Sequence, residues 1–111
     1  MQRERVLLEE IITAANRATQ IASQYTANTL ATHLDARDAL LWNLTVLGEA
    51  VNQLPEDLRN SYPEIPWQHP TRLRKRIVHG YWSVDLDVIY AVAINDLPTF
   101  VKTVGQVLQS L

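Results

Sequence analysis

The stretch LLWNLTVLGEAVNQLP, residues 40–55, decides the fold of this chain of 111 residues. Its apolar side chains recur at intervals of four and three residues, at Leu40, Leu44, Leu47, Val51 and Leu54. This spacing places them on one face of an α-helix, and Pro55 ends that helix because proline has no backbone N–H to donate. Asp35 is the candidate N-cap at its start.

The same spacing predicts a long helix on each side of this one. From about Arg3 to Ser23 the buried stripe consists of Leu7, Ile11, Ala14, Ala18 and Ile21. From Asp85 to the end of the chain the apolar side chains keep one helical phase, at Leu86, Ile89, Ala93, Leu97, Phe100, Val104, Val107 and Leu111. Because that phase continues through Pro98, we expect this proline to kink a continuous path and not to end it.

Residues 55–70 contain four prolines and predict a turn-rich connection with at most a short helix at Glu56 to Asn60. Trp67 is expected to anchor this connection against the helices. A shorter helix should begin after Pro70, with Thr71 as a possible cap, and end near Gly80. The chain has no strand alternation, so it predicts an all-α fold, an antiparallel four-helix bundle with a proline-rich irregular connection before its third helix.

The composition limits the class of protein. With 47% apolar residues, 111 residues can build one core, so we expect a single domain over 1–111. The sequence has no cysteine, which excludes disulfides and thiolate metal sites within it. The charged start Met1–Arg5 is unlike a signal peptide, and no apolar run approaches the ~20 residues of a membrane span. We therefore expect a soluble, cytoplasmic protein that does not contact membranes.

The net charge of −2 conceals a local basic cluster in TRLRKRIVHGY, residues 71–81. Four of the ten Lys and Arg residues lie within residues 72–76, close to His79. At about 100° per residue, Arg74 and His79 are separated by roughly 140° around a helix and about 7.5 Å along it. Either the helix unwinds toward Gly80, or a second copy of the chain in a two-fold dimer completes the site.

The spacing Arg74-x4-His79-x-Tyr81 resembles the signature of HepT-like toxins, a branch of the HEPN ribonuclease superfamily. The resemblance covers about Leu7 to Leu111 and includes four further blocks in the family's order: Leu47–Ala50, Pro63–Trp67, Val84–Asp87 and Asn95–Pro98. One residue departs from the pattern, because HEPN motifs commonly have a small polar residue where this chain has Lys75.

The resemblance implies a homodimeric, all-helical ribonuclease without a metal or other cofactor, the toxin of a two-gene toxin–antitoxin module. Its partner would be an MNT-type nucleotidyltransferase antitoxin, which neutralises such toxins by attaching AMP to the motif tyrosine, here Tyr81.

Metal-free RNA cleavage needs a group that transfers protons and a cation that stabilises the phosphorane, roles that suit His79 and Arg74. Arg72, Lys75 and Arg76 would seat the RNA backbone. Attack by a ribose 2'-hydroxyl cannot occur on DNA, so this chemistry selects RNA. A ribonuclease toxin of this kind would act on tRNA or mRNA.

Each of these residues has a structural alternative. His79 could cap or pack a helix end, and Arg74 could pair with Glu49 or with another carboxylate of the helix that precedes Pro55. Arg72 or Arg76 could be solvated surface charges. Tyr81 could be half-buried with its hydroxyl satisfied. The chain as a whole could be a non-catalytic helical protein that docks a nucleotidyltransferase or its nucleotide. His33 and His69 are expected in loops without a paired ligand, so a metal site is not predicted.

Overall fold

A computed structural model describes residues 2–111; Met1, the first residue of the expected domain, lies outside the described residues. The described chain is helical throughout, which confirms the all-α prediction. Its elements are α1 (Gln2–Ala22), α2 (Ala27–Leu30), α3 (Leu34–Gln53), α4 (Glu56–Ser61), α5 (Gln68–His79), the 3₁₀-helix η1 (Tyr81–Ser83), α6 (Leu86–Ala91), the π-helix η2 (Val92–Asp96) and α7 (Leu97–Gln109). No helix within residues 2–111 is long and apolar enough to cross a bilayer.

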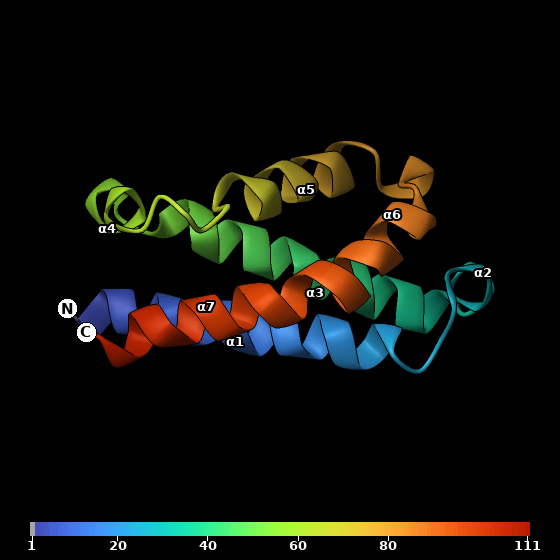
Figure 1. Cartoon of the computed structure of the whole chain (residues 1–111). Helices are drawn as coiled ribbons and strands as arrows, with labels where there is room; N and C mark the ends of the chain where they lie inside the picture. Colours follow the sequence, from blue (N-terminus) through green and yellow to red (C-terminus); the bar gives the residue numbers. More distant parts are fainter. Residues whose placement is uncertain (1) are drawn as a thin grey trace.

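Helix α3 lies at the centre of the molecule (Figure 1). Helices α1 and α7 lie side by side along one flank of it, and α5 packs along the opposite flank. Helices α1 and α3 run in opposite directions, and both ends of the chain lie at the same end of the molecule (Figure 1). Helix α3 therefore lies between α1 and α5, and α5 carries the basic cluster.

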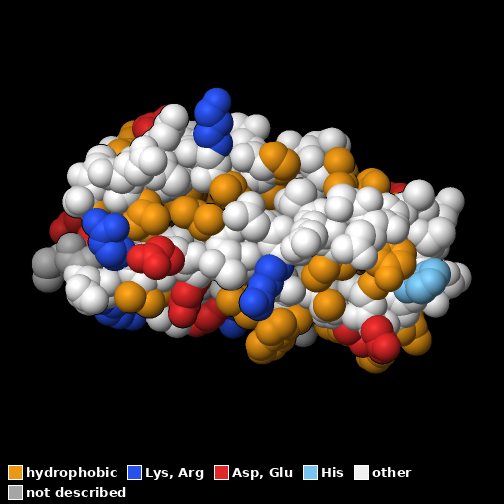
Figure 2. Space-filling model, turned by 90° about the horizontal axis from the view of Figure 1, so that it is seen from below, with side chains coloured by type: hydrophobic (Ala, Val, Ile, Leu, Met, Phe, Trp, Pro, Cys, Tyr) orange, Lys and Arg blue, Asp and Glu red, His pale blue; other side chains and the backbone are white. Residues whose placement is uncertain are grey.

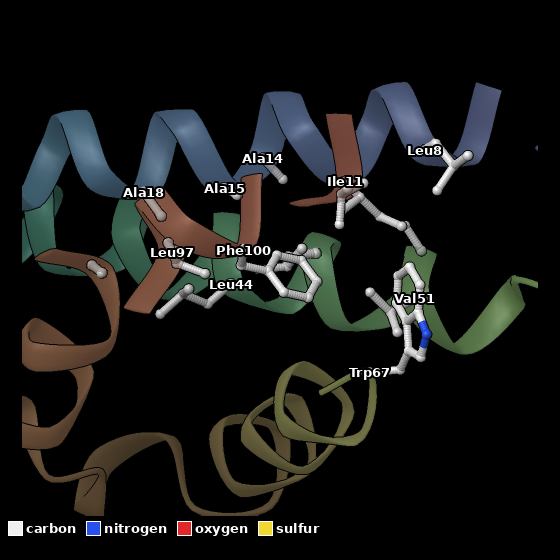
Figure 3. Close-up of a cluster of buried hydrophobic side chains, with 14 of the residues drawn as sticks. Leu8, Ile11, Ala14, Ala15, Ala18, Leu44, Val51, Trp67, Leu97 and Phe100 are labelled. Carbon is white, nitrogen blue, oxygen red and sulfur yellow. The ribbon is translucent and has the colours of Figure 1, made fainter. Parts of the chain in front are cut away.

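The core lies where α1, α3 and α7 meet (Figure 3). Small side chains on α1 let the other two helices approach closely, and larger ones interdigitate with them. The residues concerned are Leu8, Ile11, Ala14, Ala15, Ala18, Leu44, Val51, Leu97 and Phe100. Trp67 closes the core edge-on against Phe100, with 6.1 Å between ring centroids and an interplanar angle of 82°. This contact confirms that Trp67 anchors the proline-rich connection.

Two predicted caps are wrong. Helix α3 begins at Leu34 after His33, so Asp35 lies in the first helical turn and is not the N-cap. Its negative charge there interacts favourably with the helix dipole. Helix α5 begins at Gln68 and includes Pro70 in its first turn, where the missing N–H costs no helical hydrogen bond. Thr71 is therefore inside the helix and donates to the carbonyl of Gln68.

His69 lies in the first turn of α5, so the prediction that it lies in a loop is wrong.

The short helix α2 was not predicted. It is held by a capping box in which Thr26 and Thr29 satisfy each other's backbone N–H groups.

The path from Leu86 to Gln109 is continuous, as the apolar phase through Pro98 predicts, and it changes direction between α6 and α7 (Figure 1). Pro98 cannot donate a hydrogen bond to the preceding turn, and the turn just before it widens into the π-helix η2. The hydroxyl of Thr19 on α1 donates to the carbonyl of Ala93 at 2.8 Å, which satisfies one backbone acceptor of this turn.

Helix α5 approaches α3 so closely that only glycine fits at the crossing point. A Cβ added to Gly48 would lie 2.5 Å from the Cβ of Arg74 and 2.6 Å from the carbonyl oxygen of Pro70. Neither atom can move away easily, because the carbonyl oxygen belongs to the backbone and the Cβ is bonded directly to it. The distance between α3 and α5 is therefore set at Gly48.

Replacing Gly48 by alanine should lower the free energy of unfolding by about 1–3 kcal/mol, because the added methyl group overpacks this crossing. Gly105→Ala is the matched control. Its added Cβ meets nothing within 4 Å, so this variant should gain roughly 0.5–1 kcal/mol from the better helix propensity of alanine. Urea unfolding followed by circular dichroism measures both. Equal effects of the two substitutions would show that the crossing is not close-packed.

Candidate functional site

Helix α5 stays helical through His79, and the N–H of Gly80 donates to the carbonyl of Arg76 at 2.9 Å. The helix therefore does not unwind ahead of Gly80, which was one of the two ways to bring Arg74 and His79 together. The two side chains keep the divergent directions that a regular helix gives them.

Arg74 points toward α3, where its Nε lies 3.1 Å from Oε2 of Glu49. This confirms the predicted pairing of the two residues, although the contact is an ion pair and lacks hydrogen-bond geometry at Nε. The Nε atom of Arg74 is itself buried, but the two side chains are 32% and 43% exposed, so water screens the attraction mainly from the side of the carboxylate. An ion pair of this kind contributes about 0–1 kcal/mol, so Arg74 is held in place but not locked.

His79 is exposed at the end of α5, on the side that faces α6. It lines a hollow of about 450 Å³ together with Arg76, Ser83 and Asp85. An exposed position does not support the alternative that His79 is a packing residue. The ring is accessible to a ligand from solvent and has a guanidinium group in the same hollow.

Arg74 lines a different hollow, of about 220 Å³, together with Trp42, Glu49 and Gln53. No residue lines both this hollow and the one that contains His79. One copy of the chain therefore does not bring Arg74 and His79 to the same place.

Tyr81, the first residue of η1, lies in a polar cluster that the sequence did not reveal. Its hydroxyl donates to Oδ1 of Asp38 at 2.5 Å, and its carbonyl accepts a hydrogen bond of 2.7 Å from Nη2 of Arg37. The Arg37 guanidinium lies 4.9 Å from the centroid of the Tyr81 ring and 5.4 Å from that of Trp82. Tyr81 is thus partly buried with its hydroxyl satisfied, as the structural alternative predicted.

Burial raises the pKa of Tyr81 above its usual value of about 10, and the hydrogen bond and negative charge of Asp38 raise it further. The Arg37 guanidinium acts in the opposite direction. The phenol therefore remains a protonated hydrogen-bond donor at neutral pH.

Arg37 is the one polar residue that is buried within residues 2–111, with 6% of its surface exposed. A signal for it existed in the sequence, because residue 37 lies three residues before Leu40 and seven before Leu44, on the apolar stripe of α3. A charged side chain on such a stripe requires a buried partner. Asp38, its neighbour, gave no comparable signal.

The three predicted RNA-seating residues are exposed but differ in direction. Arg72 and Arg76 line a hollow of about 290 Å³ between α5 and the α6–α7 path, and Lys75 does not line it. On the opposite face of the molecule, seen from below in Figure 2, blue and red side chains are interspersed. That face has no broad area of positive charge. Arg72, Lys75 and Arg76 make α5 the candidate anion-binding surface.

No group of three or more His, Cys, Asp or Glu side chains within residues 2–111 is arranged to hold a metal ion.

The chain matches the family model described as "Ribonuclease HepT-like" over residues 11–107. The protein named "Putative RNase MJ0127" of Methanocaldococcus jannaschii is 36% identical over 66% of this chain and 60% of its own length. "Probable ribonuclease HepT" of Thermococcus cleftensis is 34% identical over 55% of this chain and 56% of its own. "Putative RNase MJ1380" of M. jannaschii is 25% identical over 90% and 92%.

The match thus spans about 60% of the length of the two more similar of these relatives. No solved structure matches the chain.

The opposing effects of Asp38 and Arg37 on Tyr81 can be measured separately. Asp38→Asn removes a negative charge and should lower the pKa of Tyr81, whereas Arg37→Met removes a positive charge and should raise it further. Tyrosinate absorbance as a function of pH, with the Tyr81→Phe curve subtracted to isolate this residue, measures both shifts. Shifts in the same direction would contradict the described cluster.

Proposed function

Since this chain belongs to the HepT-like ribonuclease family, we propose that it is a HEPN-type, metal-independent endoribonuclease that cleaves tRNA or mRNA in the cytoplasm as the toxin of a toxin–antitoxin module. The observation that supports this most is the exposure of His79 beside Arg76 at the end of a basic helix. A histidine in that position can exchange protons near a bound phosphate.

The reaction is an internal transfer of the phosphodiester. The ribose 2'-oxygen attacks the adjacent phosphorus, the bond from phosphorus to the 5'-oxygen breaks, and a 2',3'-cyclic phosphate and a 5'-hydroxyl result. His79 transfers the proton between the 2'-hydroxyl and the leaving oxygen, while Arg74 stabilises the charge on the phosphorane. A DNA strand has no attacking hydroxyl at this position.

The Arg74–Glu49 pair is compatible with phosphate binding because it is weak. It contributes about 0–1 kcal/mol, whereas hydrogen bonds to a charged group contribute about 1.5–3 kcal/mol each. A phosphate that accepts two such bonds from Arg74 therefore displaces Glu49. Before substrate binds, Glu49 holds the arginine beside α3.

A second copy of the chain would complete the site. Arg74 and His79 line separate hollows, so a two-fold homodimer is the simplest way to bring an arginine of one protomer to a histidine of the other. Large apolar side chains that such a contact could cover are exposed near these residues, namely Trp42, Val78 and Trp82. In this proposal α1, α3, α5 and the α6–α7 path form the antiparallel four-helix bundle of the HEPN type.

Tyr81 would be the regulatory position, with an MNT-type nucleotidyltransferase antitoxin as the partner. The Tyr81 oxygen attacks the α-phosphorus of ATP, the bond to the β-phosphate bridging oxygen breaks, pyrophosphate leaves and the phenolic proton is released. Attached AMP cannot keep the hydrogen bond to Asp38, and its negative charge lies two residues from His79. Modification would therefore disrupt the cluster and repel the RNA backbone.

One alternative has a specific observation in its favour. Arg74 is paired with Glu49 and Tyr81 with Asp38 inside a single chain, so two of the three motif residues have structural partners without any substrate. In that case the chain would be a non-catalytic helical protein that docks the nucleotidyltransferase or its nucleotide, without cleavage of its own.

Cleavage of total RNA in the presence of EDTA distinguishes these functions. The wild-type protein should produce fragments with 2',3'-cyclic phosphate ends, and His79→Ala and Arg74→Ala should each lower the rate by at least about a hundredfold. His33→Ala and Arg17→Ala, at exposed positions on other elements, should retain the wild-type rate. Equal cleavage by wild type and His79→Ala would exclude His79 from the chemistry, and a wild type without cleavage would favour the docking protein.

Incubation with the antitoxin, ATP and magnesium should add the mass of one or more AMP units to the chain, and Tyr81→Phe should abolish the gain. Tyr25→Phe is the matched control and should be modified as the wild type is. Intact-protein mass spectrometry gives the result. A normal mass gain in Tyr81→Phe would mean that another residue is the acceptor.

A further inference from the structure

A groove runs along α5 on the side that faces the α6–α7 path, and Leu47 of α3 lies at its floor. It consists of the hollows of about 290 Å³ and 450 Å³ described above, which adjoin because Leu73, Arg76 and Val88 line both. The groove lies between α5 and the α6–α7 path and extends from His69 to His79. It therefore leads directly to the proposed proton-transfer residue.

The groove has one basic wall, an apolar floor and an acidic rim. Arg72, Arg76 and His79 form the basic wall on α5. Toward the first turn of α5 the floor consists of Leu47, Pro66, Pro70, Val92, Leu97 and Phe100. Asp96 lies across this floor from the two arginines, as the last residue of the π-helix η2.

We propose that this groove binds the single-stranded RNA next to the scissile bond, with one nucleobase in the apolar hollow. Arg72 and Arg76 contact the phosphates that flank this base, and Asp96 accepts a hydrogen bond from an exocyclic amino group on its edge. The inference rests on the proposed function in one respect, since it takes His79 to mark the scissile bond.

The dimensions and chemistry of the hollow suit a single base. Its volume of about 290 Å³ is at the lower end of the range of small-ligand sites, about 300–1,000 Å³, so it holds a base and leaves the sugar and phosphate outside. Val88, which is 43% exposed, offers an apolar surface at the junction of the two hollows. RNA-binding proteins read single strands in this way, by enclosing an unstacked base and bonding to its edge.

The charges in the groove favour a base, and not a phosphate, beside Asp96. The carboxylate of Asp85 accepts the N–H groups of Asp87 and Val88 at 3.0 and 3.4 Å, so the start of α6 partly offsets its charge. Asp96 lies beside the apolar hollow, where it repels a phosphate but accepts a donor from a base. A carboxylate accepts from the amino group of cytosine, and uracil offers a carbonyl oxygen at that position. The groove should therefore prefer cytosine to uracil.

Binding to the His79→Ala protein tests the proposal without the need for cleavage. Fluorescence anisotropy with short labelled oligo(C) and oligo(U) should show about tenfold tighter binding of oligo(C). Asp96→Ala should reduce this preference to near unity, while Asp57→Ala, at an exposed aspartate outside the groove, should keep it. Val88→Glu should weaken both oligonucleotides about tenfold or more, and Val6→Glu, which makes the same change at an exposed valine on α1, should not.

Several results would overturn the inference. One is equal affinity for the two oligonucleotides in proteins with and without Asp96. Another is equal weakening of binding by Val88→Glu and Val6→Glu. A third is loss of the dimer in Val88→Glu alone, which would show that a second copy covers the groove. If RNA cleavage depends on His79 while any of these results holds, the proposed function stands and the inference fails. If the predicted binding pattern holds and no cleavage is found, the inference stands and the catalytic proposal fails.

Discussion

The close approach of α5 to α3 at Gly48 is the constraint on which the rest of the structure depends. With the two backbones this close, the Cβ of Arg74 lies directly over α3, and its side chain reaches Glu49. The regular geometry of α5 then fixes all its other side chains, because 100° per residue directs Arg72, Arg76 and His79 away from α3. A single small residue thus determines which charged groups face α3 and which face the groove.

The two contacts that hold α5 and the residues after it to α3 differ in strength. The Arg74–Glu49 pair is exposed and contributes about 0–1 kcal/mol. Arg37 is buried and donates to the carbonyl of Tyr81 at 2.7 Å, and a hydrogen bond from a charged group contributes about 1.5–3 kcal/mol. The segment after α5 is therefore anchored firmly at Tyr81, while Arg74 can exchange its partner. The weak pair is consistent with the proposal that a phosphate replaces Glu49 at Arg74. The firm anchor is consistent with a structural role for Tyr81, which the proposed modification of its hydroxyl would disturb.

The sequence predicted the parts of the structure that follow from helical periodicity. The helices around the stripes of Leu7 and Leu40 were expected within one or two residues, and so was the continuous path through Pro98. The starts of α3 and α5 were placed wrongly because Asp35 and Thr71 have the chemistry of caps, whereas the packing of α5 on Gly48 extends that helix back to Gln68. Local propensity does not contain such a tertiary constraint.

The candidate site was predictable only where its residues share one helix. The divergence of Arg74 and His79 follows from their spacing alone, and α5 preserves it. The contacts of Tyr81 join residues 43 and 44 positions apart, so no local pattern identified Asp38 or Arg37 as its partners. The groove between α5 and the α6–α7 path was equally hidden, because it depends on where the π-helix η2 places Asp96.

The central claim is that each chain supplies half of a ribonuclease site, and mixing two inactive variants tests it most directly. Arg74→Ala and His79→Ala proteins are unfolded together, refolded and assayed for RNA cleavage in EDTA, with hybrid dimers counted by native mass spectrometry. If an arginine of one protomer acts with a histidine of the other, half of the dimers regain one of two sites, and about a quarter of wild-type activity should return. A mixture that contains hybrid dimers and is as inactive as its two parents would contradict the account.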